Sequence, residues 1–187
     1  YTFTSERAAA ALRRAAERGL RIGVLVEGGP VGGVSEREAS VLDGLARRPN
    51  VTVTVVDGSH ARYRFHHAKY AVVDDAAFVT SENWKPGGVG GHRTRGWGAL
   101  VRNASLAADL AAVYRADTGW VDGVPWRTYR RNATVQAPHP ANATYPRAFG
   151  PRNVTADRVS LVVSPDDSRS TFERSSRTPG GATATST

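Results

Sequence analysis

Several residues of this chain lie at spacings suited to phosphate chemistry. His67 and Lys69 are two residues apart, and Asp74 follows five residues later. A histidine can attack phosphorus or donate a proton, and a lysine can neutralise a phosphoryl oxygen. An aspartate can accept a hydrogen bond from the far ring nitrogen of a histidine and stabilise its cation. These residue types predict a site for a phosphate-bearing ligand.

A second group of polar residues follows at short range. Ser81 and Asn83 come after residues 76–80, which we predict to be a short strand, and their hydroxyl and amide can hold the same phosphate. Trp84 and Lys85 come next and are candidates for contact with a lipid head group or a nucleic-acid base. Core packing of Trp84 is an equal alternative.

The first group must be positioned by the segment that carries it. Residues 63–73 are rich in aromatic and β-branched side chains, which favours a strand. Side chains on a strand alternate between its faces, so His67 and Lys69 should share one face and His66 should point to the other. The alternative is a surface strand with an unrelated histidine and lysine. Lysine usage favours the functional interpretation, because only Lys69 and Lys85 are lysines among 25 basic residues, and an ammonium and a guanidinium are not interchangeable at a phosphate.

The complete pattern resembles the signature of the phospholipase D superfamily, H-x-K-x4-D-x6-G-S-x-N, with Thr80 at the glycine position and five residues instead of six between Asp74 and Thr80. The resemblance implies a metal-independent phosphodiesterase or phosphatidyltransferase that acts through a phospho-histidine. It implies that His67 attacks the phosphorus and that Asp74 supports a catalytic histidine. Lys69, with Ser81 and Asn83, would hold the phosphoryl oxygens.

The resemblance also implies a partner. The family's active site uses two such motifs, and this chain carries one, since His60, His92 and His139 have no lysine two residues later. The second half-domain would come from a missing C-terminal half or from a second copy of the chain. The substrate would be a phosphodiester, either phospholipid or nucleic acid. The rival interpretation is a non-catalytic module that binds phosphate, nucleic acid or anionic lipid, with Trp84 and Trp97 as stacking surfaces.

The amino-acid composition excludes several kinds of catalytic and metal-binding site. The chain has no cysteine, which excludes disulfides, thiolate metal sites and cysteine nucleophiles. Its five histidines show no metal-binding spacing, so we expect no metal and no cofactor. A net charge of +8 suits an anionic partner.

The order of apolar and helical segments predicts an α/β fold. Residues 5–18, 35–47 and 105–116 read as helices, and residues 20–26, 51–56 and 96–101 as strands. Ser5 or Thr4 is expected to cap the first helix, and Ser35 with Glu38 to form a capping box at the start of the second. By resemblance, residues 1–122 form a phospholipase D-like half-domain, an α/β sandwich with a mixed, mostly parallel sheet flanked by helices. The chain has no methionine, so we expect Tyr1 to be an internal or processed end that lacks a preceding strand.

The remainder of the chain differs in composition. Residues 123–157 contain five prolines and are predicted to be an extended linker. Residues 158–187 would start a truncated second half-domain, with a strand at 159–163, and end in a disordered tail rich in Ser, Thr and Gly.

The sequence around the asparagines indicates a cellular location for the protein. Five of the six asparagines lie in N-x-S/T sequons, which are glycosylation candidates, and no apolar stretch is long enough to span a membrane. We therefore expect an extracellular or cell-surface protein. The sequons are at Asn50, Asn103, Asn132, Asn142 and Asn153.

Overall fold

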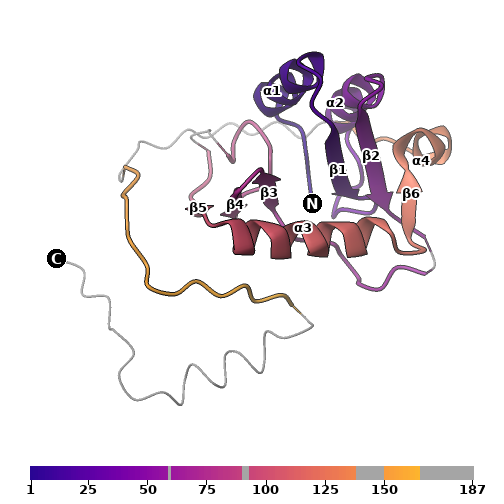
Figure 1. Ribbon diagram of the computed structural model, residues 1–187. Helices are drawn as coiled ribbons and strands as arrows, with labels where there is room; N and C mark the ends of the chain where they lie inside the picture. Colours follow the sequence, from indigo (N-terminus) through magenta and orange to yellow (C-terminus); the bar gives the residue numbers. More distant parts are fainter. Residues whose placement is uncertain (59, 90–92, 138–149, 165–187) are drawn as a thin grey trace. The chain divides into compact units, whose positions relative to one another are not determined.

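The computed structural model describes residues 1–58, 60–89, 93–137 and 150–164 (Figure 1). The chain divides into two units, residues 1–152 and 153–187. The first unit is a mixed α/β fold. Its elements in chain order are α1 (Glu6–Glu17), β1 (Ile22–Glu27), α2 (Glu36–Ala46), β2 (Val51–Val56), β3 (Tyr70–Val73), β4 (Ala76–Thr80), β5 (Gly98–Arg102), α3 (Ala104–Thr118), β6 (Gly123–Pro125) and α4 (Trp126–Asn132).

The strands form two three-stranded sheets, in the orders β1-β2-β6 and β3-β4-β5. β1 and β2 are parallel, whereas the β2–β6, β3–β4 and β4–β5 pairs are antiparallel. The expected sandwich with a mostly parallel sheet is therefore not confirmed. The second sheet departs from it because only Asp74 and Asp75 separate β3 from β4. So short a connection permits antiparallel pairing alone.

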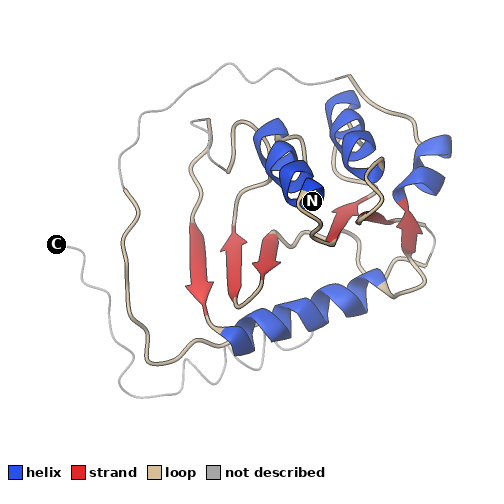
Figure 2. Ribbon diagram, turned by 45° about the horizontal axis from the view of Figure 1, so that its top comes forward, coloured by secondary structure: helices blue, strands red, loops and turns tan. Residues whose placement is uncertain are grey.

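Helices lie on opposite sides of the strands. Figure 2 shows α1 and α2 on one side and α3 on the other. The main core lies between β1, β2 and the first two helices, where Val41, Leu42, Leu45 and Val55 are fully shielded from solvent. The apolar runs that predicted β1 and β2 supply five of the fourteen buried residues of this core, as expected for strands covered by helices.

Hydroxyl caps begin the first two helices as their sequences predict. The Ser5 side chain accepts a hydrogen bond from the Ala8 amide at 3.3 Å, and that of Ser35 accepts one from the Glu38 amide at 3.2 Å. Glu38 does not return a bond to its own cap. Its carboxylate is buried and accepts from the Phe3 amide at 2.6 Å, and burial raises the pKa of this carboxyl group. The glutamate thus joins α2 to the segment that precedes α1.

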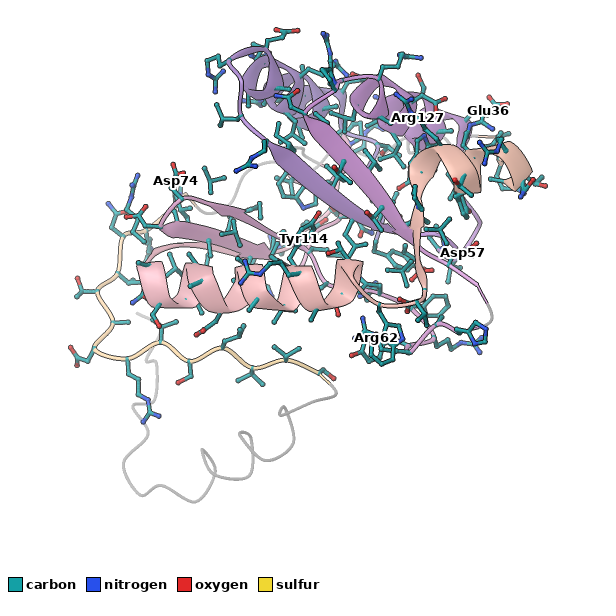
Figure 3. The ribbon with its side chains drawn as sticks, turned by 45° about the vertical axis from the view of Figure 1, so that its right-hand side comes forward. Glu36, Asp57, Arg62, Asp74, Tyr114 and Arg127 are labelled. Atoms are coloured by element: carbon teal, nitrogen blue, oxygen red, sulfur yellow. The ribbon has the colours of Figure 1, made fainter. Side chains whose placement is uncertain are left out.

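Helix α3 contacts both sheets. It packs on β3 and β4, and Figure 3 shows its Tyr114 reaching toward the strands. A Cβ at Gly23 of β1 would lie only 2.1 Å from the Tyr114 hydroxyl oxygen. The glycine therefore provides the space that the phenol ring occupies, and burial raises the pKa of Tyr114.

The prediction of an extended linker at 123–157 is wrong for its first part, residues 123–132. Residues 123–125 form β6 beside β2, and α4 follows with Trp126 buried. Pro125 does not break this structure because it is the residue before the helix, where its missing amide hydrogen is not needed. Residues 138–149 of the predicted linker lie outside the described residues.

The strand predicted at 159–163 is also not observed, since the described part of the second unit, residues 153–164, contains no helix or strand. Val159 and Val162 are about half exposed. A β-strand needs a neighbouring strand to bind its amides and carbonyls, and apolar composition does not supply one. The predicted disordered tail, which follows Asp167, lies outside the described residues.

In the described parts of the chain, no helix combines the length and the apolar character needed to cross a lipid bilayer.

Candidate active site

The strand that carries the histidine–lysine pair is shorter than predicted. It begins at Tyr70, and residues 63–69 are irregular rather than extended into the sheet. The cause is a side-chain acceptor. The His66 amide donates to the buried Glu27 carboxylate at 2.6 Å, so it is not available to a neighbouring strand. Glu27 is the last residue of β1, and it therefore ties the motif segment to the C-terminal end of that strand.

His67 and Lys69 nevertheless come together on one side of this segment, against Tyr1. The rings of His67 and Tyr1 lie 4.5 Å apart between centroids, in an edge-on arrangement. The Lys69 ammonium lies 5.2 Å from the Tyr1 ring centre and donates to the His67 carbonyl oxygen at 2.6 Å. His67 is exposed and Lys69 is 93% shielded, as 7% of its surface remains accessible. A solvent-facing imidazole thus lies beside a partly enclosed cation.

The tyrosine itself is held by the glycine-rich loop that follows β1. Its hydroxyl oxygen accepts a hydrogen bond from the Val31 amide at 2.6 Å. Glu27 shapes the same loop, because its second carboxylate oxygen accepts from the Gly29 amide at 2.8 Å. The loop at the carboxyl end of β1 is therefore fastened to the residues around His67.

This environment disfavours positive charge on His67. Partial desolvation and then the nearby charge of Lys69 lower the pKa of the His67 imidazole below its ordinary value of 6.5. Burial likewise lowers the pKa of Lys69, while the carboxylate of Glu82 opposes that shift. A neutral imidazole keeps a lone pair for attack at neutral pH.

The direction of this shift can be measured. In a histidine-resolved NMR titration, we expect His67 to titrate with a midpoint below 6.5. Lys69→Met removes a neighbouring positive charge, so the imidazolium becomes less unfavourable and the midpoint should rise toward 6.5. Lys85→Met is the matched control and should leave His67 unchanged, because Lys85 acts on Lys69. A parent midpoint above 6.5 would contradict this description.

Ser81 and Thr80 fasten the next segment to Trp97. The Ser81 hydroxyl accepts from the Trp97 amide at 3.0 Å, and the Thr80 hydroxyl donates to the Trp97 carbonyl at 2.9 Å. Thr80, which replaces the family's glycine, also accepts from the Glu82 amide at 3.1 Å. The threonine is therefore accommodated by bonds of its own, and Ser81 remains exposed beside it.

Asn83 has an uncommitted side-chain oxygen. This Oδ1 atom is buried and has no hydrogen-bond partner among the described residues. Unpaired buried polar atoms are uncommon and call for an explanation. Rotation of the amide exchanges its oxygen and nitrogen, so the same position can present an N–H donor to a bound anion.

The two residues after the motif differ in their surroundings. Trp84 packs edge-on against Phe3 and Phe78, with ring centroids 5.9 and 6.3 Å apart, and its carbonyl accepts from the Thr4 amide at 2.8 Å. Trp84 therefore packs against the core, which is the alternative to a role in ligand contact. Lys85 lies close enough to Lys69 for its charge to lower the Lys69 pKa.

Asp74 lies at the turn of the β3–β4 hairpin rather than beside the histidine–lysine pair. It is exposed and has a positive φ of 53°, a conformation that aspartate tolerates better than most residues (Figure 3). The carboxylate that does contact a histidine of this segment is Asp117, whose Oδ2 lies 2.9 Å from His66 Nε2.

Sequence reasoning missed Tyr1, Glu27 and Asp117. Asp117 could have been found, because it lies seven residues after the inward-facing Leu110 of α3 and so occupies an inward position with a charged side chain. Glu27 gives a similar signal, as an acid that ends an apolar strand. No local pattern brings Tyr1 to His67, since that contact depends on the tertiary fold.

Comparison with known proteins agrees with the motif. Residues 1–117, more than half of the chain, match the family described as "Cardiolipin synthase, PLD-like domain". No curated protein matches the chain. The family match contains β1 to β5 and both groups of motif residues. The chain therefore belongs to the phospholipase D superfamily.

Proposed function

We propose that this chain supplies one half of the active site of a metal-independent phosphodiesterase or phosphatidyltransferase. The observation that carries the proposal is the placement of an exposed His67 beside the enclosed Lys69 ammonium around the Tyr1 ring. The pair combines a nucleophile with a fixed positive charge, which is what attack on a phosphodiester requires.

In this mechanism His67 attacks the phosphorus through a ring nitrogen. The new P–N bond forms as the bond from phosphorus to the leaving oxygen breaks, and a second histidine donates a proton to that oxygen. Water or an alcohol, deprotonated by the same second histidine, then attacks the phospho-histidine and releases the product. Lys69 offsets the charge that builds on the phosphoryl oxygens.

The remaining motif residues have supporting roles in this proposal. Asn83 and Ser81 hold phosphoryl oxygens. The clearest support is the buried position of the Asn83 side-chain oxygen, which has no partner among the described residues and can present an N–H donor when the amide rotates. Lys85 extends the positive field around the phosphate. Asp74 lies in the turn of the β3–β4 hairpin. Its support of a catalytic histidine is proposed from the family pattern alone.

The second histidine must come from outside the motif of this chain. A second half-domain that follows in a longer protein is one source, and a second copy of this chain is the other. The two sources differ in how activity depends on protein concentration. If two copies complete the site, specific activity should rise with concentration until the dimer is saturated.

The test is hydrolysis of bis(p-nitrophenyl) phosphate in EDTA over a range of protein concentrations. Turnover that survives EDTA supports phosphodiester chemistry without a metal. Turnover that EDTA abolishes overturns the metal-independent mechanism. A chain with no turnover at any concentration, together with activity when a second half-domain is supplied, assigns the chain to a half-site.

The second candidate function is binding without turnover. Trp97 favours it, because its side chain is 66% exposed and can stack on a base or insert among lipid tails, and the chain is strongly basic. Salt-sensitive binding to an oligonucleotide or to anionic vesicles, with no hydrolysis of either in the presence of a second half-domain, would favour this alternative.

An extracellular or cell-surface location is a further part of the proposal, and it rests on the sequons. Asn132 and Asn153 are exposed and can accept a glycan, whereas both Asn50 amide hydrogens are used, in bonds to the Ala16 and Leu20 carbonyls at 2.8 and 2.6 Å. Asn103 caps α3 through its side-chain oxygen, and Asn142 lies outside the described residues. Peptide mapping of native protein should find glycans at Asn132 or Asn153 before Asn50. A native mass equal to that of the bare chain would contradict export through a glycosylating pathway.

A further inference from the structure

We propose that His66 is a positioning residue for His67: its ring, bound to Asp117, fixes the backbone from which the proposed nucleophile projects. The inference rests on the proposed function, in which His67 reacts with phosphorus. It assigns distinct roles to two adjacent histidines.

His66 is held by two elements at once. Its amide donates to Glu27 at the end of β1 at 2.6 Å, and its Nε2 lies 2.9 Å from Asp117 Oδ2 near the end of α3. Only 9% of the residue is exposed. Since an ionised carboxylate only accepts hydrogen bonds, Nε2 must carry the proton. That nitrogen is thus committed to Asp117 and not available to a substrate.

Asp117 is itself fixed by Arg62. One guanidinium nitrogen of Arg62 donates to the other Asp117 oxygen at 2.9 Å. The guanidinium also lies over the Tyr63 and Trp120 rings, 5.2 and 4.6 Å from their centres. The Arg62 backbone amide donates to the buried Asp122 at 3.2 Å. A carboxylate bound on both oxygens cannot rotate away from His66 without breaking an ion pair.

The other side of His67 is also restrained. The Lys69 carbonyl accepts from the Thr80 amide at 3.0 Å, and the Lys69 ammonium donates to the His67 carbonyl. His67 therefore lies between two anchored residues, and its ring extends from a backbone that is fixed on each side. Loss of the His66 ring contact leaves that side held by the bond from the His66 amide to Glu27 alone, so the backbone next to His67 is less firmly fixed. A shift of about 1 Å in a reacting group can lower a rate by about a hundredfold.

If His66 had only a structural role, it would stabilise the fold without positioning His67. The experiment must distinguish this structural role from the positioning role. His66→Gln and His66→Asn are a matched pair, because the glutamine amide nitrogen can take the place of Nε2 beside Asp117 and the shorter asparagine amide cannot reach it. We would measure kcat and KM for bis(p-nitrophenyl) phosphate, the NMR titration of His67, and thermal unfolding for both variants and the parent chain, adding the second half-domain where turnover needs it.

We expect His66→Asn to lower kcat by about 10- to 100-fold with little change in KM. The His67 titration should move toward that of an unrestrained histidine, because the ring leaves Tyr1 and Lys69. His66→Gln should retain most of the parent's kcat and a His67 titration close to that of the parent. His66→Asn with the parent's kcat and the parent's His67 titration would overturn the proposal, whatever its unfolding temperature.

The titration also separates this inference from the proposed function. If the parent shows no turnover even when a second half-domain is supplied, the proposed function fails on its own, and the His67 titration still decides the positioning role. A titration that moves in His66→Asn and returns in His66→Gln supports that role, and one that stays unchanged overturns it. If His66→Asn does not fold, His66→Leu, which fills similar space without a donor, replaces it in the same comparison.

Discussion

His67→Ala is expected to abolish hydrolysis of bis(p-nitrophenyl) phosphate, with kcat lower by a factor on the order of 10³ or more. The substitution removes the atom that bonds to phosphorus, and no other described group can replace it. His66 Nε2 is bound to Asp117. Because His67 is exposed, the variant should fold like the parent chain, and circular dichroism can check this.

His60→Ala is the matched control for this experiment. His60 is also exposed, but it lies outside the motif and has no lysine two residues later. It should retain the parent's kcat. If His67→Ala retained activity as well, the assignment of the nucleophile would be wrong, and the motif would have only a binding role.

Trp126→Ala is expected to destabilise the domain by about 3–5 kcal/mol, a range typical of large buried aromatic side chains. Trp126 is 2% exposed, stacks on Tyr129 with centroids 5.6 Å apart, and donates from its indole nitrogen to Asp43 at 2.7 Å. The substitution leaves a cavity and removes a hydrogen bond to α2. Equilibrium unfolding in urea measures the change.

Trp97→Ala provides the comparison, since Trp97 is 66% exposed and its side chain adds little to the core. Its free energy of unfolding should change by less than about 0.5 kcal/mol. A loss below about 1 kcal/mol for Trp126→Ala would mean that α4 does not contribute to the folded domain. The predicted result instead extends the domain to include residues that follow the family match.

Local patterns predicted much of this structure. Ser5 and Ser35 begin the helices that they were expected to cap, because capping depends on residues within one turn. The pairing of His67 with Lys69 followed from their two-residue spacing, although the segment is irregular. Both features need information from only a few neighbouring residues.

Features that depend on distant residues were not predictable in the same way. The segment before Tyr70 is not a strand because Glu27, far away in sequence, binds the His66 amide. Glu38 leaves its expected capping role for the Phe3 amide. Helix α4 was read as linker, since the prolines around it outweighed the signal of one buried tryptophan. In each case a tertiary contact decides between local alternatives of similar energy.

The close approach of Tyr114 to Gly23 constrains how this domain can change during evolution. A Cβ at position 23 would also lie 2.8 Å from the Tyr114 ring carbon that bears the hydroxyl, so phenylalanine at 114 would not make enough room. A side chain at 23 therefore requires Tyr114 to move away from β1 or to be replaced by a smaller residue. Among related sequences, the two positions should covary, with glycine at 23 wherever an aromatic ring occupies 114.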